Sequence, residues 1–106
     1  MCYLGDMDKK TVLERLRLAA PELKALGVEH AYLFGSHARG DADQYSDIDI
    51  ALEHPSGFKI APRLLLSLYG LIGERLGDDI ALDVVMLPAK TRSLEVAIEK
   101  DRVIAF

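Results

Sequence analysis

Three aspartates lie inside segments that otherwise have the composition of buried strands. Asp47 and Asp49 belong to "SDIDIAL", and Asp83 belongs to "IALDVVML". Burying an ionised carboxylate is costly unless the group is paired or binds a cation. Alternate side chains of a strand share a face, so Asp47 and Asp49 project together, and Asp83 joins them if its strand lies alongside in register. Such a grouping is a hard-oxygen site suited to Mg2+ or Mn2+.

A short turn precedes the aspartates. In "GSHARG" (35–40), Gly35 allows close backbone approach, and the backbone N–H groups with the Ser36 hydroxyl can face a phosphate. Arg39 can neutralise phosphate charge, and Gly40 lets the chain turn back. The turn is weak evidence by itself, but its coupling to "SDID" at this distance makes the pattern specific.

Two common phosphate or cation motifs are absent. No Gly-Lys-Ser/Thr occurs, which excludes a Walker P-loop. An EF-hand loop begun at Asp41 fails as well, because Ser46 replaces its glycine and Leu52 replaces its bidentate glutamate.

Other polar residues of the turn have simpler interpretations. We predict that His37 is a solvated loop residue, with a position facing the nucleotide as the alternative, and that Asp41 and Asp43 are turn formers rather than metal ligands. Tyr45 is interpreted as a surface residue or loop anchor, and Ser46 as support for the turn into the aspartate strand.

Strands are expected where β-branched or aromatic residues run into breaks. The segment "HAYLF" (30–34) leads into the Gly-Ser turn, and residues 46–52 alternate between polar and apolar. Residues 80–87 are expected to form a central strand stopped by Pro88, and "RVIAF" predicts a short edge strand.

Helices are expected between these strands. A capping box at Thr11–Glu14 predicts a helix start, and Pro21 predicts a break with a restart that ends at Gly27. A leucine stripe predicts a core helix over 61–76, in which Tyr69 is read as core, although it and exposed leucines could also contact a partner. A last helix is predicted over 92–100, with Ser93 near its N-cap.

Composition bounds the function. The chain has 106 residues and is 50% hydrophobic, which predicts one domain over residues 1–106. A net charge of −4 argues against direct binding to the phosphate backbone of duplex nucleic acid.

Cysteine content and hydropathy indicate the compartment. Because Cys2 is the single cysteine, no intrachain disulfide can form, and neither a leader nor a membrane span is visible. His30 and His54 have no companion that indicates a metal site. We therefore expect a soluble, unprocessed, cytoplasmic protein that does not contact membranes.

The stretch "GSHARGDADQYSDIDIAL" (35–52) resembles the Gly-Ser, Arg-Gly, Ser-Asp-x-Asp signature of the DNA polymerase β-like nucleotidyltransferase superfamily. It is most similar to the small stand-alone minimal nucleotidyltransferase (MNT) branch, and the order of elements fits nearly the whole chain. The resemblance implies an α+β fold, with a small mixed β-sheet and helices packed on one face.

The resemblance also implies a two-metal mechanism. Asp47 and Asp49 would hold two Mg2+ ions, with Mn2+ as a possible substitute, and one ion would also bind the triphosphate of ATP. Asp83 would complete the ion that activates an acceptor hydroxyl for attack at the α-phosphorus.

The remaining signature residues are implied to bind phosphate. Gly35 and Ser36 would contact the β and γ phosphates, and Arg39 would offset charge on the departing pyrophosphate. An NMP, AMP by family default, would be left on the acceptor.

The acceptor follows from family and size rather than from named residues. Stand-alone MNT proteins commonly act as antitoxins of HEPN-domain toxins, in some cases by adenylylating a toxin tyrosine. Two alternatives stay open: a non-catalytic antitoxin or binding module that acts by contact, and a nucleotidyltransferase subunit acting on RNA or a small molecule. The sequence leaves a homo- or hetero-oligomer equally open.

Overall fold

Four strands form one mixed sheet in the order β3-β2-β1-β4. The computed structural model describes residues 8–40, 47–77 and 81–106; the predictions for Cys2, Asp41, Asp43, Tyr45 and Ser46 lie outside these ranges. The elements are α1 (Lys9–Leu18), α2 (Ala20–Ala25), β1 (His30–Phe34), α3 (Ser36–Arg39), β2 (Ile48–Glu53), the 3-10 helix η1 (Gly57–Lys59), α4 (Pro62–Leu76), β3 (Leu82–Leu87), α5 (Arg92–Asp101) and β4 (Val103–Ile104).

Strand directions make the sheet mixed. β1 is antiparallel to both β2 and β4, whereas β2 and β3 are parallel and are joined through α4. A parallel pair needs such a crossover connection, and the leucine stripe of residues 61–76 provides it. The α+β fold with a small mixed sheet is confirmed.

β3 lies at the edge of the sheet, so the prediction of a central strand is wrong. Its apolar composition has another cause, because both of its faces are covered. Val84 and Met86 join the larger hydrophobic cluster, whereas Leu87 joins the smaller one. A strand that is buried on both faces is rich in apolar residues whether it lies at the edge or in the centre of a sheet.

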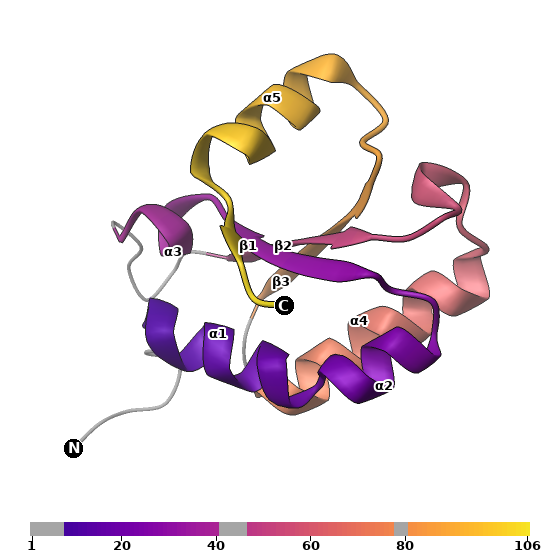
Figure 1. Ribbon diagram of the computed structural model, residues 1–106, viewed down its shortest axis with the longest axis horizontal. Coiled ribbons are helices and arrows are strands. Elements are labelled where there is room, and N and C mark those ends of the chain that lie inside the picture. Colours follow the sequence, from indigo (N-terminus) through magenta and orange to yellow (C-terminus); the bar gives the residue numbers. More distant parts are fainter. Residues whose placement is uncertain (1–7, 41–46, 78–80) are drawn as a thin grey trace.

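The two clusters lie on opposite faces of the sheet. The fully buried Ile48, Ile50 and Leu52 face the helices α1, α2 and α4. Ala51 points the other way and packs near Ile98 of α5. Figure 1 shows this arrangement, with α1, α2 and α4 on one side of the strands and α5 on the other. The predicted alternation of β2 is therefore present, and α5 adds cover to the second face.

Two helices begin at residues other than the predicted ones. The N-cap of α1 is Asp8, whose carboxylate accepts from the Thr11 backbone N–H at 2.9 Å, so Thr11 is inside the helix. The N-cap of α5 is Thr91, whose hydroxyl accepts from the Leu94 N–H at 3.2 Å, rather than Ser93. Both caps are short oxygen-bearing side chains that satisfy an otherwise unpaired helix N–H.

Tyr69 of α4 contacts the backbone of the edge strand β3. The Val84 N–H donates to the Tyr69 hydroxyl at 3.0 Å, and that hydroxyl lies 3.5 Å from the Val84 carbonyl oxygen. Tyr69 is half-buried against the larger cluster. Its ring is therefore part of the core, as the helical spacing predicts. Its hydroxyl provides a hydrogen-bond partner for the backbone of β3 at Val84, on the edge of the sheet.

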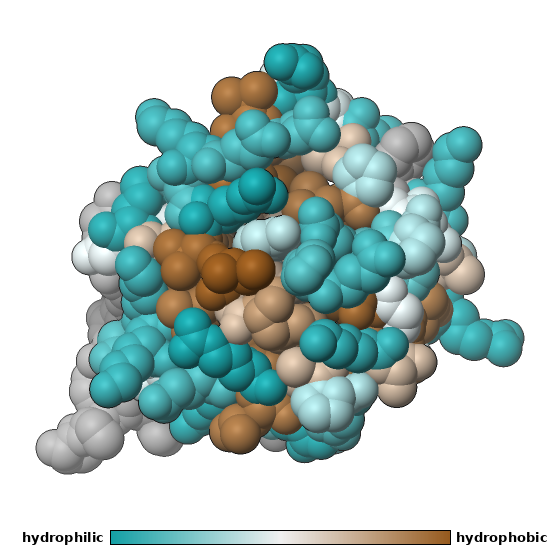
Figure 2. Space-filling model, in the orientation of Figure 1, coloured by the Kyte–Doolittle hydropathy of each residue, from teal (hydrophilic) through white to brown (hydrophobic). Residues whose placement is uncertain are grey.

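The surface is mixed in character. Figure 2 shows separate apolar patches within a largely hydrophilic face. The large hydrophobic side chains most exposed to solvent lie on different elements: Leu18, Leu66, Val96 and Ile104. None of the helices in the described ranges is long and apolar enough to cross a membrane.

Candidate functional site

The parallel pairing of β2 and β3 places two aspartates side by side. Asp49 is the register partner of Asp83, and on its other side Asp49 pairs with Phe34 of β1. Paired residues of neighbouring strands project on the same face, so both carboxylates stand on the face that α5 partly covers. Asp47 precedes β2 and is exposed.

The environment of Asp49 disfavours its charge. Burial raises the pKa of the Asp49 carboxyl above its usual range, with further contributions from the negative charges of Asp83 and Asp47. Interactions with His37 and Arg39 lower that pKa only in part. A half-buried carboxylate repelled by its neighbours is stabilised by any cation that binds beside it.

Gly35 makes room for this carboxylate. It follows β1 with φ +77° and ψ −154°, a conformation available essentially to glycine alone. A β-carbon at Gly35 would overlap the Asp49 carboxylate. Ser36 then begins the four-residue helix α3, which ends at Gly40 in the left-handed conformation. The strands predicted on either side of the turn are present as β1 and β2, residues 36–39 form a short helix that was not predicted, and Gly35 lies directly against Asp49.

His37 is buried, so its interpretation as a solvated loop residue is wrong. Only 7% of its surface is exposed, and its Nδ1 lies 3.1 Å from the Asp47 carbonyl oxygen. A carbonyl oxygen can only accept, so Nδ1 carries the hydrogen and donates. His37 thus ties the turn to the start of the aspartate strand. Its place next to Ser36 in "GSHARG" gives no sign of this bond.

Arg39 makes an ion pair with a residue from the far end of the chain. Its Nη1 donates to Asp101 Oδ2, at the C-terminal end of α5, at 2.8 Å. Nothing in the sequence marks Asp101, because it lies outside every motif and more than 60 positions from Arg39.

The aspartates fit a divalent cation by their chemistry. Asp49 and Asp83 present hard oxygen donors from neighbouring strands, and the Asp49 carboxylate occupies the space that a β-carbon at position 35 would fill. Within the described residues, no group of three or more His, Cys, Asp or Glu side chains converges closely enough to hold a metal ion. The structure thus brings together Asp49 and Asp83, and the three-aspartate ligand set stays a prediction.

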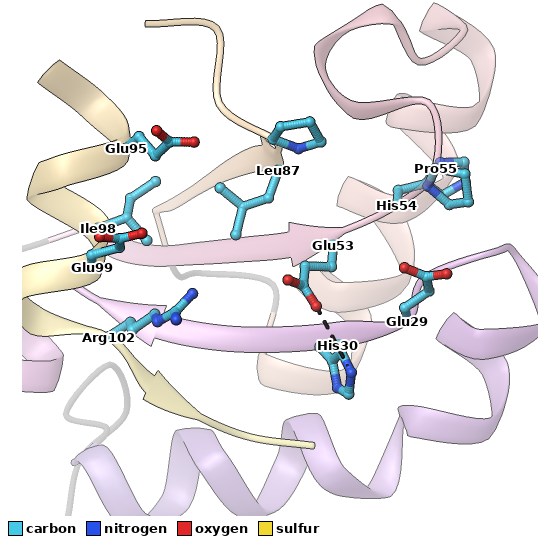
Figure 3. Close-up of a pocket in the computed structure, with 11 residues that line it drawn as sticks. Glu29, His30, Glu53, His54, Pro55, Leu87, Glu95, Ile98, Glu99 and Arg102 are labelled. Carbon is cyan, nitrogen blue, oxygen red and sulfur yellow. Dashed lines mark ion pairs between the residues drawn. The ribbon is translucent and has the colours of Figure 1, made fainter. Parts of the chain in front are cut away.

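A separate cavity of about 490 Å³ opens at the other end of the same sheet face. It lies beside Glu53, four residues along β2 from Asp49, or roughly 13 Å at the rise of a strand. Figure 3 shows Glu95 and Glu99 of α5 on one side and the His30–Glu53 pair, 3.8 Å apart, on the sheet. The lining residues are Glu29, His30, Glu53, His54, Pro55, Leu87, Pro88, Glu95, Ile98, Glu99 and Arg102.

The histidines and tyrosine near this cavity have structural partners. His54 accepts from the Ser56 N–H at 3.0 Å and has its other ring nitrogen 3.2 Å from the Leu26 carbonyl oxygen. Arg102 lies over the Tyr32 ring at 4.7 Å. Burial raises the pKa of Tyr32, and the nearby Glu53 charge adds to the effect.

Comparison with known proteins identifies the domain. Residues 13–105 match the nucleotidyltransferase domain family, which is nearly the whole chain. No curated protein is significantly similar in sequence.

Solved structures share the fold. One chain of a toxin-antitoxin complex with AMP-PNP is 22% identical, with a TM-score of 0.66 over 94% of this chain and 73% of that one. The complex of a tri-AMPylated Shewanella oneidensis HEPN toxin with an MNT antitoxin contains a chain 22% identical, with a TM-score of 0.56 over 85% and 71%. A candidate minimal nucleotidyltransferase is 30% identical, with a TM-score of 0.60 over 92% of this chain and 95% of that one. The resemblance seen in the sequence is thus confirmed. The chain belongs to the nucleotidyltransferase domain family, and it is similar to minimal nucleotidyltransferases within that family.

Proposed function

We propose that the chain, acting as a single catalytic domain over residues 1–106, is a Mg2+-dependent transferase of AMP from ATP to a hydroxyl of a protein acceptor. The observation that carries the proposal is the register of Asp49 with Asp83 directly against the Gly35 turn. Carboxylates that can bind divalent cations beside a phosphate-binding turn are what nucleotidyl transfer requires of a protein scaffold.

Each signature side chain has a proposed role. Asp47 and Asp49 would hold two Mg2+ ions, with Asp83 as a further ligand. These ions would supply positive charge that lowers the pKa of the acceptor hydroxyl and stabilises the triphosphate. Burial, together with the negative charges of Asp83 and Asp47, raises the pKa of Asp49; this supports a cation-binding role, because a bound cation stabilises the ionised carboxylate.

The phosphate-facing roles belong to the turn. Ser36 and the backbone at Gly35 bind the β and γ phosphates, and Arg39 offsets charge on the departing pyrophosphate. The acceptor oxygen forms a bond to the α-phosphorus while the bond from that phosphorus to the bridging oxygen breaks. Pyrophosphate leaves, and the hydroxyl proton passes to solvent.

The proposed acceptor is a HEPN-domain toxin, for which this chain is the antitoxin. Support comes from the related structures, one a toxin-antitoxin complex with AMP-PNP and another an AMPylated HEPN toxin bound to its MNT antitoxin. The net charge of −4 gives the domain no general attraction for nucleic acid and favours a protein acceptor over RNA.

The test is transfer of label from ATP. The purified protein is incubated with Mg2+, a HEPN-domain protein from the same host, and ATP labelled at either the α or the γ phosphate. We expect label on the acceptor from α-labelled ATP only, and no label with the variant Asp47→Asn/Asp49→Asn. The variant Glu95→Gln/Glu99→Gln removes the same charge from α5 and should label normally.

Two results would count against the proposal. Normal labelling by the double aspartate variant would show that these two carboxylates are not needed for AMP transfer. If no acceptor is labelled while the toxin is still inhibited, the contact-only antitoxin becomes the correct description.

A further inference from the structure

Arg39 and Asp101 connect the signature turn to the last helix. The 2.8 Å ion pair joins α3 to the final residue of α5, and in Figure 1 the C-terminal end of α5 lies close to α3. The Asp101 side chain is 16% exposed and that of Arg39 is 48% exposed. Asp101 is thus the more buried partner, and the arginine is the more accessible one.

Asp101 occupies a well-anchored position. Ile98, one turn earlier on α5, is buried in the cluster on the sheet face. Arg102, the next residue, lies over the Tyr32 ring of β1. The carboxylate also stands at the negative end of the helix dipole, which favours a cation there. These contacts fix the point at which Arg39 is held.

The positive charge of Arg39 also acts on the Asp49 carboxylate. The guanidinium therefore lies within electrostatic range of two carboxylates, one at the end of α5 and one on β2. A guanidinium held at α5 keeps its charge beside the turn.

We propose that Asp101 is a positioning residue, which holds the Arg39 guanidinium where it meets the terminal phosphates of the nucleotide. This inference rests on the phosphate-binding role proposed above for Arg39. It assigns to α5 a part in nucleotide binding, although none of its residues belongs to the signature.

The test is a double-mutant cycle on nucleotide binding, measured by calorimetry with AMP-PNP and Mg2+. We expect Arg39→Ala to weaken AMP-PNP binding about tenfold and Asp101→Asn about fivefold, with the double variant no weaker than Arg39→Ala, as for contacting residues that act together. AMP lacks the β and γ phosphates, so its affinity should be unchanged in Asp101→Asn. A purely structural loss would weaken both ligands.

Two further variants complete the cycle. Glu99→Gln removes the same charge from an exposed position of α5 and should bind AMP-PNP like the wild type. Asp101→Glu keeps a carboxylate and should recover most of the AMP-PNP affinity that Asp101→Asn loses. Thermal unfolding shows whether Asp101→Asn folds; if it does not, the Asp101→Glu variant takes its place in the binding measurement.

The outcomes separate the two claims. Unchanged AMP-PNP binding in Arg39→Ala would contradict the phosphate role proposed for Arg39. A loss in Arg39→Ala with none in Asp101→Asn, or an equal loss of AMP and AMP-PNP, would overturn only the positioning role of Asp101.

Discussion

Gly35 and Gly40 bracket the turn that faces the aspartates, but they are constrained differently. Both have positive φ, +77° and +87°, yet a β-carbon at Gly35 would overlap Asp49, whereas at Gly40 it would meet none of the described residues within 4 Å. We predict that Gly35→Ala lowers the free energy of unfolding by about 3 kcal/mol and abolishes AMP transfer, since backbone strain and collision add.

Gly40→Ala is the matched control for this prediction. This variant should lose only about 1 kcal/mol of unfolding free energy, from the strain of the left-handed conformation, and should keep transfer activity. Urea unfolding and the label-transfer assay measure both variants. Similar losses of stability and activity in the two would show that the space beside Asp49 is unimportant.

Asp49 illustrates a conflict between stability and function at one residue. Because burial and the charges of Asp83 and Asp47 raise its pKa, the ionised carboxylate destabilises the folded state at neutral pH without a cation. We predict that Asp49→Asn raises the free energy of unfolding by on the order of 1 kcal/mol in EDTA, a size typical of substitutions that relieve functional strain.

Magnesium should reverse the order of stability of the wild type and Asp49→Asn. Binding to the folded state alone raises the thermal midpoint of the wild type, whereas Asp49→Asn should respond weakly. Glu99→Gln, which removes an exposed carboxylate, should behave like the wild type with and without Mg2+. A wild-type midpoint that does not move with Mg2+ would contradict the proposed cation site.

At the scale of elements, the N-terminus of α5 offers a direct comparison of two candidate caps. Thr91 accepts from Leu94 N–H, whereas Ser93 lies inside the helix. We predict that Thr91→Ala costs about 1 kcal/mol of unfolding free energy and that Ser93→Ala changes it little. Chemical denaturation of both variants decides between them, and a larger loss for Ser93→Ala would reverse the assignment.

The boundaries of several elements could be predicted because their signals are local. The strand at His30–Phe34 and the helix over Pro62–Leu76 match the expected ranges closely, since aromatic content, apolar stripe and glycine stops all act within a few residues. The caps of α1 and α5 were misassigned because each start offers two suitable side chains. The path of the incoming chain selects between them, and the sequence does not display that path.

At the scale of the whole molecule, predictability falls with sequence separation. The alternation of β2 predicts that Asp49 shares a face with Asp47, but its register with Asp83 depends on how α4 returns the chain to the sheet. The burial of His37 and the pairing of Arg39 with Asp101 depend on contacts between distant segments. Local pattern therefore finds the candidate ligands, and only the assembled fold shows which residues support them.

The hydroxyl of Tyr69 has a consequence for how separate molecules meet. An exposed edge strand invites a second chain to add its own strand, and that route leads to aggregation. Tyr69 blocks this at Val84 by occupying backbone groups of β3. We predict that Tyr69→Phe, which leaves the ring in place, increases light scattering at high protein concentration, while Ser67→Ala on an exposed turn of α4 does not. A single oxygen would thus keep the sheet from growing beyond its own chain.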